Sequence, residues 1–345
     1  MQEETMAMTG AVFVQTNEID NRVLAFRRYA EGGLGDPSSY ATGGSGTATP
    51  HLPSQGSVVL SEDSRFLLVA NAASNDVSVF GVEEADLRPI ATVASGGEAP
   101  RSITERAGTV FVLNTGKPGI AAFRLSEAGL APVAGADTAL SSAAADPAQI
   151  GLSPDSPTLV VTERGTDAIE VFPVAADGSL GEPTLVPSSG PTPYGFAFAS
   201  NGRLVVTEAF RAEKGAAAAS SYAWRSGAAT PISRSLGNGM SEICWAVVTS
   251  DDRYVFTTNF AESTVSRFAL AMDGSITLED AVAGSIGDRR PGLRDEGLSE
   301  DGQFLYAIDA DGGRLVGWRI GDDGTLSPGI VRDGLPKTIA GLAAR

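Results

Sequence analysis

A short β-rich run that ends in an amide or acidic residue recurs seven times along this 345-residue chain. The terminal residues of these runs are Asn17, Asn71, Asn114, Glu163, Glu208, Asn259 and Asp309. The six intervals between residue 17 and residue 309 average about 49 residues. A fixed period of this length indicates repeated supersecondary units that each bury a face against the next unit.

Each repeat has the same neighbours, as the stretch "PAQIGLSPDSPTLVVTERGTDAIEVF" (147–172) illustrates. A strand and a turn precede the marked run, a third strand follows it, and a weaker fourth strand ends the unit. Asp-Gly pairs such as Asp177–Gly178 and Asp273–Gly274 are strong hairpin signals, because glycine accepts the positive φ of a tight turn. Four antiparallel strands in about 49 residues form a propeller blade. We therefore predict an all-β, seven-bladed β-propeller.

The two ends of the chain complete each other. The start, "AVFVQTN", is a second-type strand without a first strand before it, and the end, "LPKTIAGLAAR", reads as a first-type strand with nothing after it. A blade shared by the two ends would hide two sheet edges and lock the ring. We predict one propeller domain over residues 10–345, after a tail of residues 1–9.

The charge and composition of the chain limit the classes of partner that it is expected to bind. The net charge of −17 is scattered along the chain and would repel phosphate backbones and anionic headgroups, so neither nucleic acid nor membrane is expected as a partner. The single cysteine allows no intramolecular disulfide, and the first ten residues lack the regions of a signal peptide. We expect a cytoplasmic monomer that acts on a small molecule, although a leader removed beforehand would also fit.

Antiparallel order brings the start of each first strand close to the end of each second strand, at one mouth of the central channel. The residues that open first strands are therefore candidate ligand-binding residues. With His51, which lies in a link between blades, they form the predicted binding set: Gln55, Arg101, Gln149, Tyr194, Trp245 and Arg294. The loop of residues 211–220 is the longest between second and third strands and is a candidate lid.

The strand-end residues allow two interpretations. Asn and Asp at such positions often cap turns by bonding nearby backbone amides. Glutamate forms turns less readily, so Glu163 and Glu208 are the members of the series that we predict to be catalytic.

The blade pattern, clearest in residues 147–172 and in "SEDGQFLYAIDADGGRLVGW" (299–318), resembles the lactonase family of seven-bladed propellers. That family includes propeller-type 6-phosphogluconolactonases and carboxymuconate-lactonizing enzymes. The resemblance implies histidine, arginine and glutamate residues at the channel mouth, and Glu208 matches the glutamate. Tyr194 and Gly195 stand where a histidine and an arginine are usual, Gln149 stands for another histidine, and Phe260 follows Asn259 where the family has an arginine. Four arginines remain that could replace the lost cations: Arg101, Arg164, Arg211 and Arg294.

Sequence motifs of other common enzyme classes are absent. No nucleophile elbow, Walker A loop or dinucleotide fingerprint occurs. One histidine and one cysteine do not supply the usual zinc ligands. No cofactor is expected; Ca²⁺ or Mg²⁺ on carboxylates such as Glu163, Glu208 and Asp309 stays open, without a motif that marks a site. We expect Cys244 to be a packing residue.

Three functions follow as hypotheses. The first is hydrolysis or formation of a carboxylated or phosphorylated lactone, with Glu208 as acid/base, Glu163 assisting, and Arg101 and Arg294 holding the anion. The second is a propeller that binds a small molecule or protein without catalysis. The third is another acid/base reaction at the same mouth, such as that of an isomerase, cyclase or glycosidase. Convergence of both glutamates with an arginine in one cavity would favour the first; burial in strand packing would weigh against it.

Overall fold

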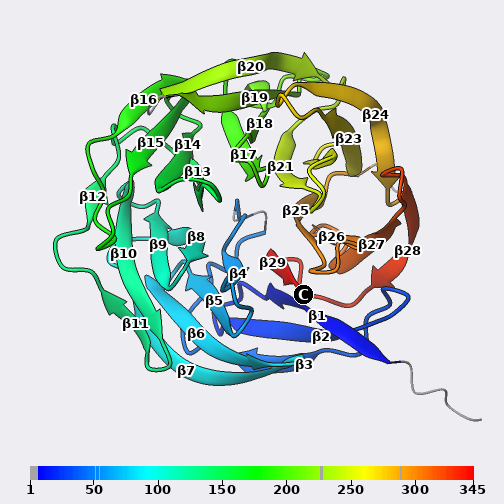
Figure 1. The fold of residues 1–345 in the computed structure, drawn as a ribbon. Helices are drawn as coiled ribbons and strands as arrows, with labels where there is room; N and C mark the ends of the chain where they lie inside the picture. The colour runs from blue at the N-terminus through cyan, green and yellow to red at the C-terminus, as the bar shows by residue number, and fades with distance from the viewer. Residues whose placement is uncertain (1–6, 51, 54, 226–227, 288–289) are drawn as a thin grey trace, which may run out of the picture.

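Seven β-sheets are arranged around a central axis in the computed structural model, which describes residues 7–50, 52–53, 55–225, 228–287 and 290–345 (Figure 1). Each sheet is a blade of at least four strands paired antiparallel, and consecutive blades follow one another around the ring. The predicted seven-bladed propeller is therefore confirmed. No helix in these residues is long and apolar enough to cross a membrane.

Both ends of the chain build the closing blade. From the channel outwards its strands are β29 (Ala340–Ala344), β1 (Met8–Gln15), β2 (Arg22–Tyr29) and β3 (Ser38–Ala41). β1 pairs with β29 on one side and with β2 on the other, so the last strand of the chain completes the sheet that the first strand begins. This closure is the predicted one, and β1 starts two residues before the predicted domain boundary.

The other six blades follow in chain order, and their strands run from the channel outwards. The first two comprise β4 (Val58–Leu60), β5 (Phe66–Asn71), β6 (Asp76–Glu83), β7 (Asp86–Ala94), then β8 (Pro100–Arg106), β9 (Thr109–Asn114), β10 (Gly119–Ser126), β11 (Gly129–Pro132), with β12 (Thr138–Ala139) also on β10. The next two comprise β13 (Pro147–Leu152), β14 (Thr158–Glu163), β15 (Ala168–Pro173), β16 (Thr184–Pro187), then β17 (Pro193–Phe198), β18 (Leu204–Glu208), β19 (Ala218–Arg225), β20 (Ala228–Gly237). The last two comprise β21 (Ile243–Val248), β22 (Tyr254–Asn259), β23 (Thr264–Leu270), β24 (Ile276–Ser285), then β25 (Leu293–Leu298), β26 (Phe304–Asp309), β27 (Arg314–Ile320), β28 (Leu326–Arg332).

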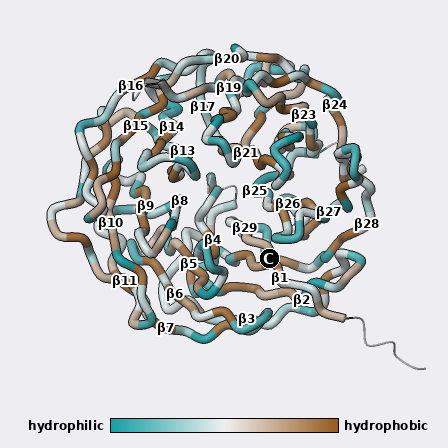
Figure 2. The backbone as a smooth tube through the Cα atoms, viewed as in Figure 1, coloured by the Kyte–Doolittle hydropathy of each residue, from teal (hydrophilic) through white to brown (hydrophobic). Residues whose placement is uncertain are grey.

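The core lies between the blades. Neighbouring blades share one large apolar cluster each, so that Leu113 of β9, for example, packs in the same cluster as Leu159 and Val161 of β14. Second strands are buried on both faces, which explains why they read as continuous apolar runs rather than alternating ones. Figure 2 shows these apolar stretches in every part of the ring.

A β-bulge near the start of the inner strand recurs in six of the seven blades. In β17, for example, Pro193 pairs with Glu208 but Phe196 pairs with Val206, so the inner strand holds one extra residue. β13, β21 and β25 show the same irregularity. A bulge bends its strand and re-aims the side chains in it. Because of the bulge, Tyr194, Cys244 and Arg294 do not follow the regular alternation of side chains between the two faces of a strand.

Candidate functional site at the channel mouth

A cavity of about 330 Å³ opens where β17, β21 and β25 begin. Its wall is supplied by residues before or within these strands and by the loops that follow β18 and β22: Thr192, Tyr194, Ala209, Arg211, Ala212, Glu242, Ile243, Cys244, Phe260 and Arg294. The structure therefore brings together Tyr194 and Arg294 from the predicted binding set, in a cavity at the predicted mouth.

Arg294 is the most unusual residue of this wall. Its side chain lies over the ring of Phe260, with 5.3 Å between the guanidinium carbon and the ring centroid. The residue is only 5% exposed, and its Nε and Nη1 are enclosed without a hydrogen-bond partner among the described residues. Burying a guanidinium without an anion is costly. An anionic ligand in the cavity would supply the missing partner.

Tyr194 is the second aromatic residue that lines the cavity. Its ring packs edge-on against Trp245, with centroids 4.8 Å apart, and Arg164 lies over its other side at 4.8 Å. Burial raises the pKa of Tyr194 to about 12, so its phenol stays protonated and can donate a hydrogen bond at neutral pH. Trp245 is fully buried and supports Tyr194 from behind; it does not line the cavity.

Gly195 lets β17 and β21 approach closely beside this aromatic pair. A Cβ at residue 195 would lie 2.5 Å from the carbonyl oxygen of Cys244 and 2.7 Å from the Trp245 ring. The absence of a side chain is therefore a packing requirement that keeps Tyr194 and Trp245 in contact.

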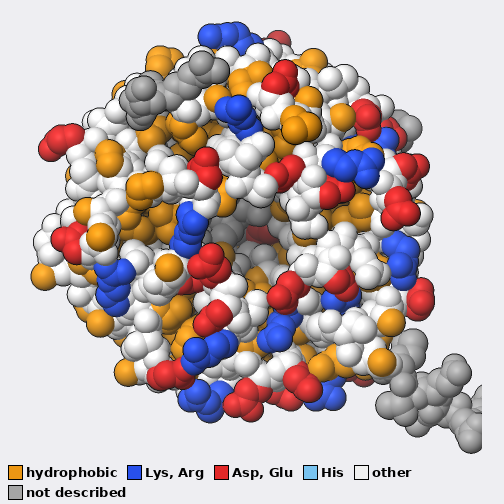
Figure 3. All heavy atoms as spheres, in the orientation of Figure 1, with side chains coloured by type: hydrophobic (Ala, Val, Ile, Leu, Met, Phe, Trp, Pro, Cys, Tyr) orange, Lys and Arg blue, Asp and Glu red, His pale blue; other side chains and the backbone are white. Residues whose placement is uncertain are grey.

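Two more arginines flank the cavity. Arg164 binds Asp146, with 2.7 Å between Nη2 and Oδ1, and Arg211 forms an ion pair with Asp167. Arg101 does not line the cavity. Burial, together with the charge of Arg164, lowers the pKa of Arg101. Arg164 and Arg211 are thus each neutralised by an acidic partner beside the cavity. Figure 3 shows acidic and basic side chains interspersed around the hollow centre of one face of the disc.

The placement predicted for Glu208 is wrong. Its side chain is fully buried and turns from the channel into its own blade and the link before it. Ser220 Oγ and Ser235 Oγ donate to its carboxylate at 2.6 and 2.7 Å, and the Gly190 N–H donates at 2.9 Å. This carboxylate anchors the link that enters β17.

Glu163 is likewise enclosed rather than open to a cavity. Ser141 Oγ donates to both of its oxygens at 3.1 Å, and Thr166 also donates to it. Glu170 of β15 is fully buried and lies beside Glu163. Burial and this neighbour raise the pKa of Glu170 to about 8, so Glu170 is protonated at neutral pH.

The remaining strand-end residues are anchors of the same type. Asn114 exchanges hydrogen bonds with Ser95, Asn259 bonds Asn238, and Asp309 pairs with Arg290 and Arg314. All seven positions are at most 1% exposed. The described contacts of these residues, including the two glutamates, are thus internal to the protein and are made largely with side chains.

Gln55 and Gln149 have structural partners as well. The Gln149 amide donates to the Phe196 carbonyl at 3.0 Å and accepts from the Phe196 N–H at 2.8 Å. Likewise, the Gln55 amide donates to the Glu296 carbonyl at 3.1 Å and accepts from the Glu296 N–H at 3.4 Å. Each amide satisfies the free edge of an inner strand, and neither lines the cavity. His51 lies outside the described residues.

Glu242 is the acidic residue of the cavity wall that the sequence did not single out. It immediately precedes β21, as Thr192 precedes β17, and both residues adopt a positive φ. An alignment of the residue before each first strand, rather than of the residue ending each second strand, would have marked it.

Cys244 lines the cavity but is unsuited to attack. Burial raises the pKa of its thiol to about 12, and Sγ donates to the Glu242 carbonyl at 3.4 Å. The expected packing role fits this environment.

The loop between β18 and β19 forms part of the cavity through Ala209, Arg211 and Ala212. It begins with the short 3₁₀ turn η1 (Phe210–Ala212), and all three of its residues have positive φ, at 47°, 52° and 61°. Non-glycine residues in this conformation cost about 1 kcal/mol or more each. Arg211 ties this turn to Asp167 of the preceding blade, which helps to hold the strained turn over the cavity.

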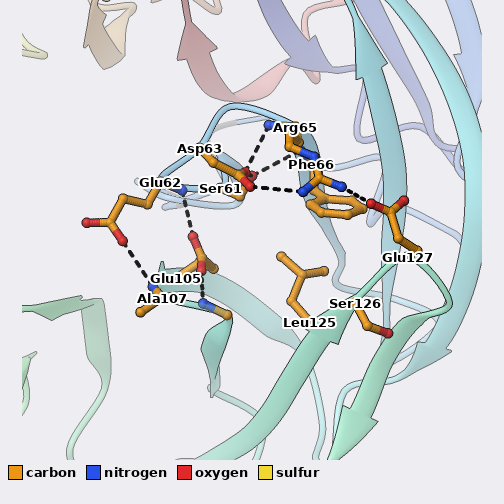
Figure 4. A pocket seen from close by; sticks show the side chains of 11 residues that line it. Ser61, Glu62, Asp63, Arg65, Phe66, Glu105, Ala107, Leu125, Ser126 and Glu127 are labelled. Atoms are coloured by element: carbon orange, nitrogen blue, oxygen red, sulfur yellow. Dashed lines mark hydrogen bonds and ion pairs between the residues drawn. The ribbon is translucent and has the colours of Figure 1, made fainter.

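A larger cavity, about 490 Å³, lies between the turns that follow β4, β8 and β10 (Figure 4). Its carboxylates are already bound: Glu105 accepts from the N–H groups of Glu62 and Gly108 at 2.6 Å, and Glu62 accepts from Ala107 at 3.1 Å. Arg65 reaches Glu127 and Asp63. These contacts cap turns, so the smaller cavity at the mouth is the better candidate site.

The geometry defines a propeller with a cavity at one channel mouth, where a buried arginine has no ion-pair partner among the described residues. The family description "Lactonase, 7-bladed beta-propeller" matches residues 6–128 and 104–209, which together span more than half of the chain. The chain therefore belongs to the seven-bladed β-propeller lactonase family. A search among curated protein sequences gives no significant match.

Solved structures agree on the fold. The periplasmic gluconolactonase of Pseudomonas aeruginosa superposes with a TM-score of 0.76 at 16% identity, covering 96% of this chain and 98% of that one. A candidate 6-phosphogluconolactonase from Bacteroides uniformis gives 0.73 at 16% identity, with the same shares covered. A protein from Lactobacillus plantarum gives 0.74 at 15%, covering 97% and 99%. Identities this low show the shared architecture alone.

Proposed function

We propose that the protein hydrolyses or forms a small anionic lactone in the cavity at the channel mouth. The observation that carries this proposal is Arg294, a buried guanidinium in the wall of that cavity for which the described part of the chain offers no anionic partner. Family membership supports lactone chemistry in general terms. The mouth also supplies the groups that acyl transfer to water requires.

In this mechanism Glu242 is the general base. Its carboxylate removes a proton from the water that attacks the lactone carbonyl, and it returns the proton to the ring oxygen as the C–O bond breaks. The Tyr194 phenol, protonated because burial raises its pKa to about 12, donates a hydrogen bond to the developing oxyanion. Arg294 holds the acid group of the substrate. Lactone formation follows the same path in reverse.

Kinetics of matched variants test the assignment of Glu242. Glu242→Gln keeps the size of the side chain but cannot take a proton, so kcat on a panel of carboxylated and phosphorylated lactones is expected to fall about 100-fold or more. Glu213→Gln is the control, because Glu213 is exposed in the neighbouring loop and does not line the cavity. Equal kcat values for wild type and Glu242→Gln would remove Glu242 from the mechanism.

A propeller that binds its ligand without catalysis is the second candidate, and the enclosure of Glu163 and Glu208 favours it. Its signature is saturable binding of an anionic lactone that depends on Arg294, with no turnover of any member of the panel. The same set of proteins distinguishes the two functions.

A further inference from the structure

We infer that the ligand of the mouth cavity is a small monoanion with an apolar body, such as an aryl-substituted lactone carboxylate, rather than a polyhydroxylated sugar acid. This inference rests on the proposed function for the lactone ring, and it adds the class of substituent that the ring carries.

The wall of the cavity is mostly carbon and sulfur. Ala209, Ala212, Ile243 and Cys244 are part of it, and Phe260 forms the surface beside Arg294. The ring of Tyr194 adds a second aromatic surface. Contact with such a wall contributes about 25 cal/mol for each Å² of apolar ligand surface removed from water.

Polar groups at the mouth are largely committed to the protein itself. The Thr192 hydroxyl accepts from the Arg211 N–H at 3.1 Å, and the Arg211 guanidinium is paired with Asp167. The amide of Gln149 is bound to the Phe196 backbone. A sugar acid would bring several hydroxyl groups into this space, and each one left without a partner costs about 1–3 kcal/mol.

In the part of the cavity wall that the structure describes, a single cationic group, the Arg294 guanidinium, is available to bind an anionic ligand. Arg294 is the cation of the cavity wall for which the described residues offer no ion pair, whereas Arg211 already has one. Its position on Phe260 places the charge directly beside an aromatic surface. One anionic group next to an apolar or aromatic body matches this arrangement.

The size of the cavity agrees with a compact ligand. About 330 Å³ lies at the lower end of the range found for small-molecule sites, which runs from about 300 to 1,000 Å³. A single lactone ring with one aromatic substituent and one carboxylate is of this size.

Two probes test the inference. Phenylparaconate is a γ-lactone with one phenyl group and one carboxylate, and 6-phosphogluconolactone is the polyhydroxylated alternative. Hydrolysis of both is followed by acid release, and binding of phenylparaconate and of 6-phosphogluconate by calorimetry. We expect phenylparaconate to have at least a tenfold higher kcat/KM and at least a tenfold lower Kd. Phe260→Ser should weaken phenylparaconate about tenfold, a larger loss than it causes for 6-phosphogluconate.

Arg294→Met keeps the aliphatic stem and removes the charge, and it should weaken phenylparaconate about 10- to 100-fold. Arg319→Met, in β27 and paired with Glu31 far from the cavity wall, is the matched control and should bind as wild type does. A preference for the sugar phosphate overturns the inference while lactone hydrolysis stands. Binding of phenylparaconate without turnover sustains the inference and overturns the proposed hydrolysis. Absence of phenylparaconate binding overturns the inference.

Discussion

The buried acid pair of β14 and β15 makes the stability of the protein depend on pH. Glu163 and Glu170 are both fully buried and lie side by side. The Ser141 N–H donates to Glu170 at 3.1 Å, and the Ser141 hydroxyl donates to Glu163 at 3.1 Å. Burial, with the neighbouring Glu163 carboxylate, raises the pKa of Glu170 from 4.5 to about 8. We predict that replacing Glu170 by glutamine removes one titration from the unfolding equilibrium.

The sign follows from the two pKa values. Below pH 4.5, Glu170 is protonated in both the folded and the unfolded chain and adds no pH dependence. Between pH 4.5 and about 8 the unfolded chain loses this proton while the folded chain keeps it. The free energy of unfolding therefore falls by about 1.4 kcal/mol for each pH unit on account of this group. Across two pH units the loss is about 2.7 kcal/mol.

Urea unfolding at three pH values between 5.5 and 7.5 measures this slope for wild type and Glu170→Gln. Glutamine keeps the size of the side chain and does not titrate, so the variant removes the titration with little change in packing. Its slope should be less negative than that of wild type by about 1.4 kcal/mol per pH unit. Glu182→Gln, an exposed change in the same blade, should follow wild type. Parallel lines for wild type and Glu170→Gln would refute the reasoning.

Two further predictions concern other buried groups. Glu296 occupies the position on its inner strand that apolar residues fill in other blades, namely Ile103, Ile150 and Phe196. Both carboxylate oxygens of Glu296 lack a hydrogen-bond partner among the described residues. Burial raises the pKa of Glu296 well above its usual value. Glu296→Leu should therefore raise the free energy of unfolding by about 1–3 kcal/mol at pH 7 in urea titrations, and a destabilised variant would show that Glu296 has a partner it needs. The Cys244 thiol, whose pKa burial raises to about 12, should react with a thiol reagent at pH 8 far more slowly in the folded protein than in urea; equal rates would contradict the burial.

Much of the fold follows from the sequence because its repeat has a single physical cause. A strand buried on both faces must be apolar throughout and must end where the chain turns, so the seven terminal residues mark seven second strands. The incomplete units at the two ends of the chain similarly imply the shared blade of β29 and β1.

The direction of a side chain at a strand end could not be predicted in the same way. Glu208 and Tyr194 lie at the same edge of one blade, yet Glu208 turns into the blade and Tyr194 lines the cavity. A one-residue bulge in β17 makes this difference, and its position depends on pairing partners that no local pattern specifies. The hydroxyls that enclose Glu208 come from Ser220 and Ser235, which the sequence places 12 and 27 residues away.

The location of a bound ligand tests the central claim most directly. A crystal structure of the protein soaked with a carbocyclic analogue of phenylparaconate, which cannot be hydrolysed and keeps a single carboxylate, would show where the anion lies. Our account predicts the carboxylate within hydrogen-bonding distance of the Arg294 guanidinium and the phenyl group against Phe260, in the cavity beside Glu242. A ligand bound in the cavity near Glu105, or a fully occupied ligand elsewhere with Arg294 untouched, would contradict it.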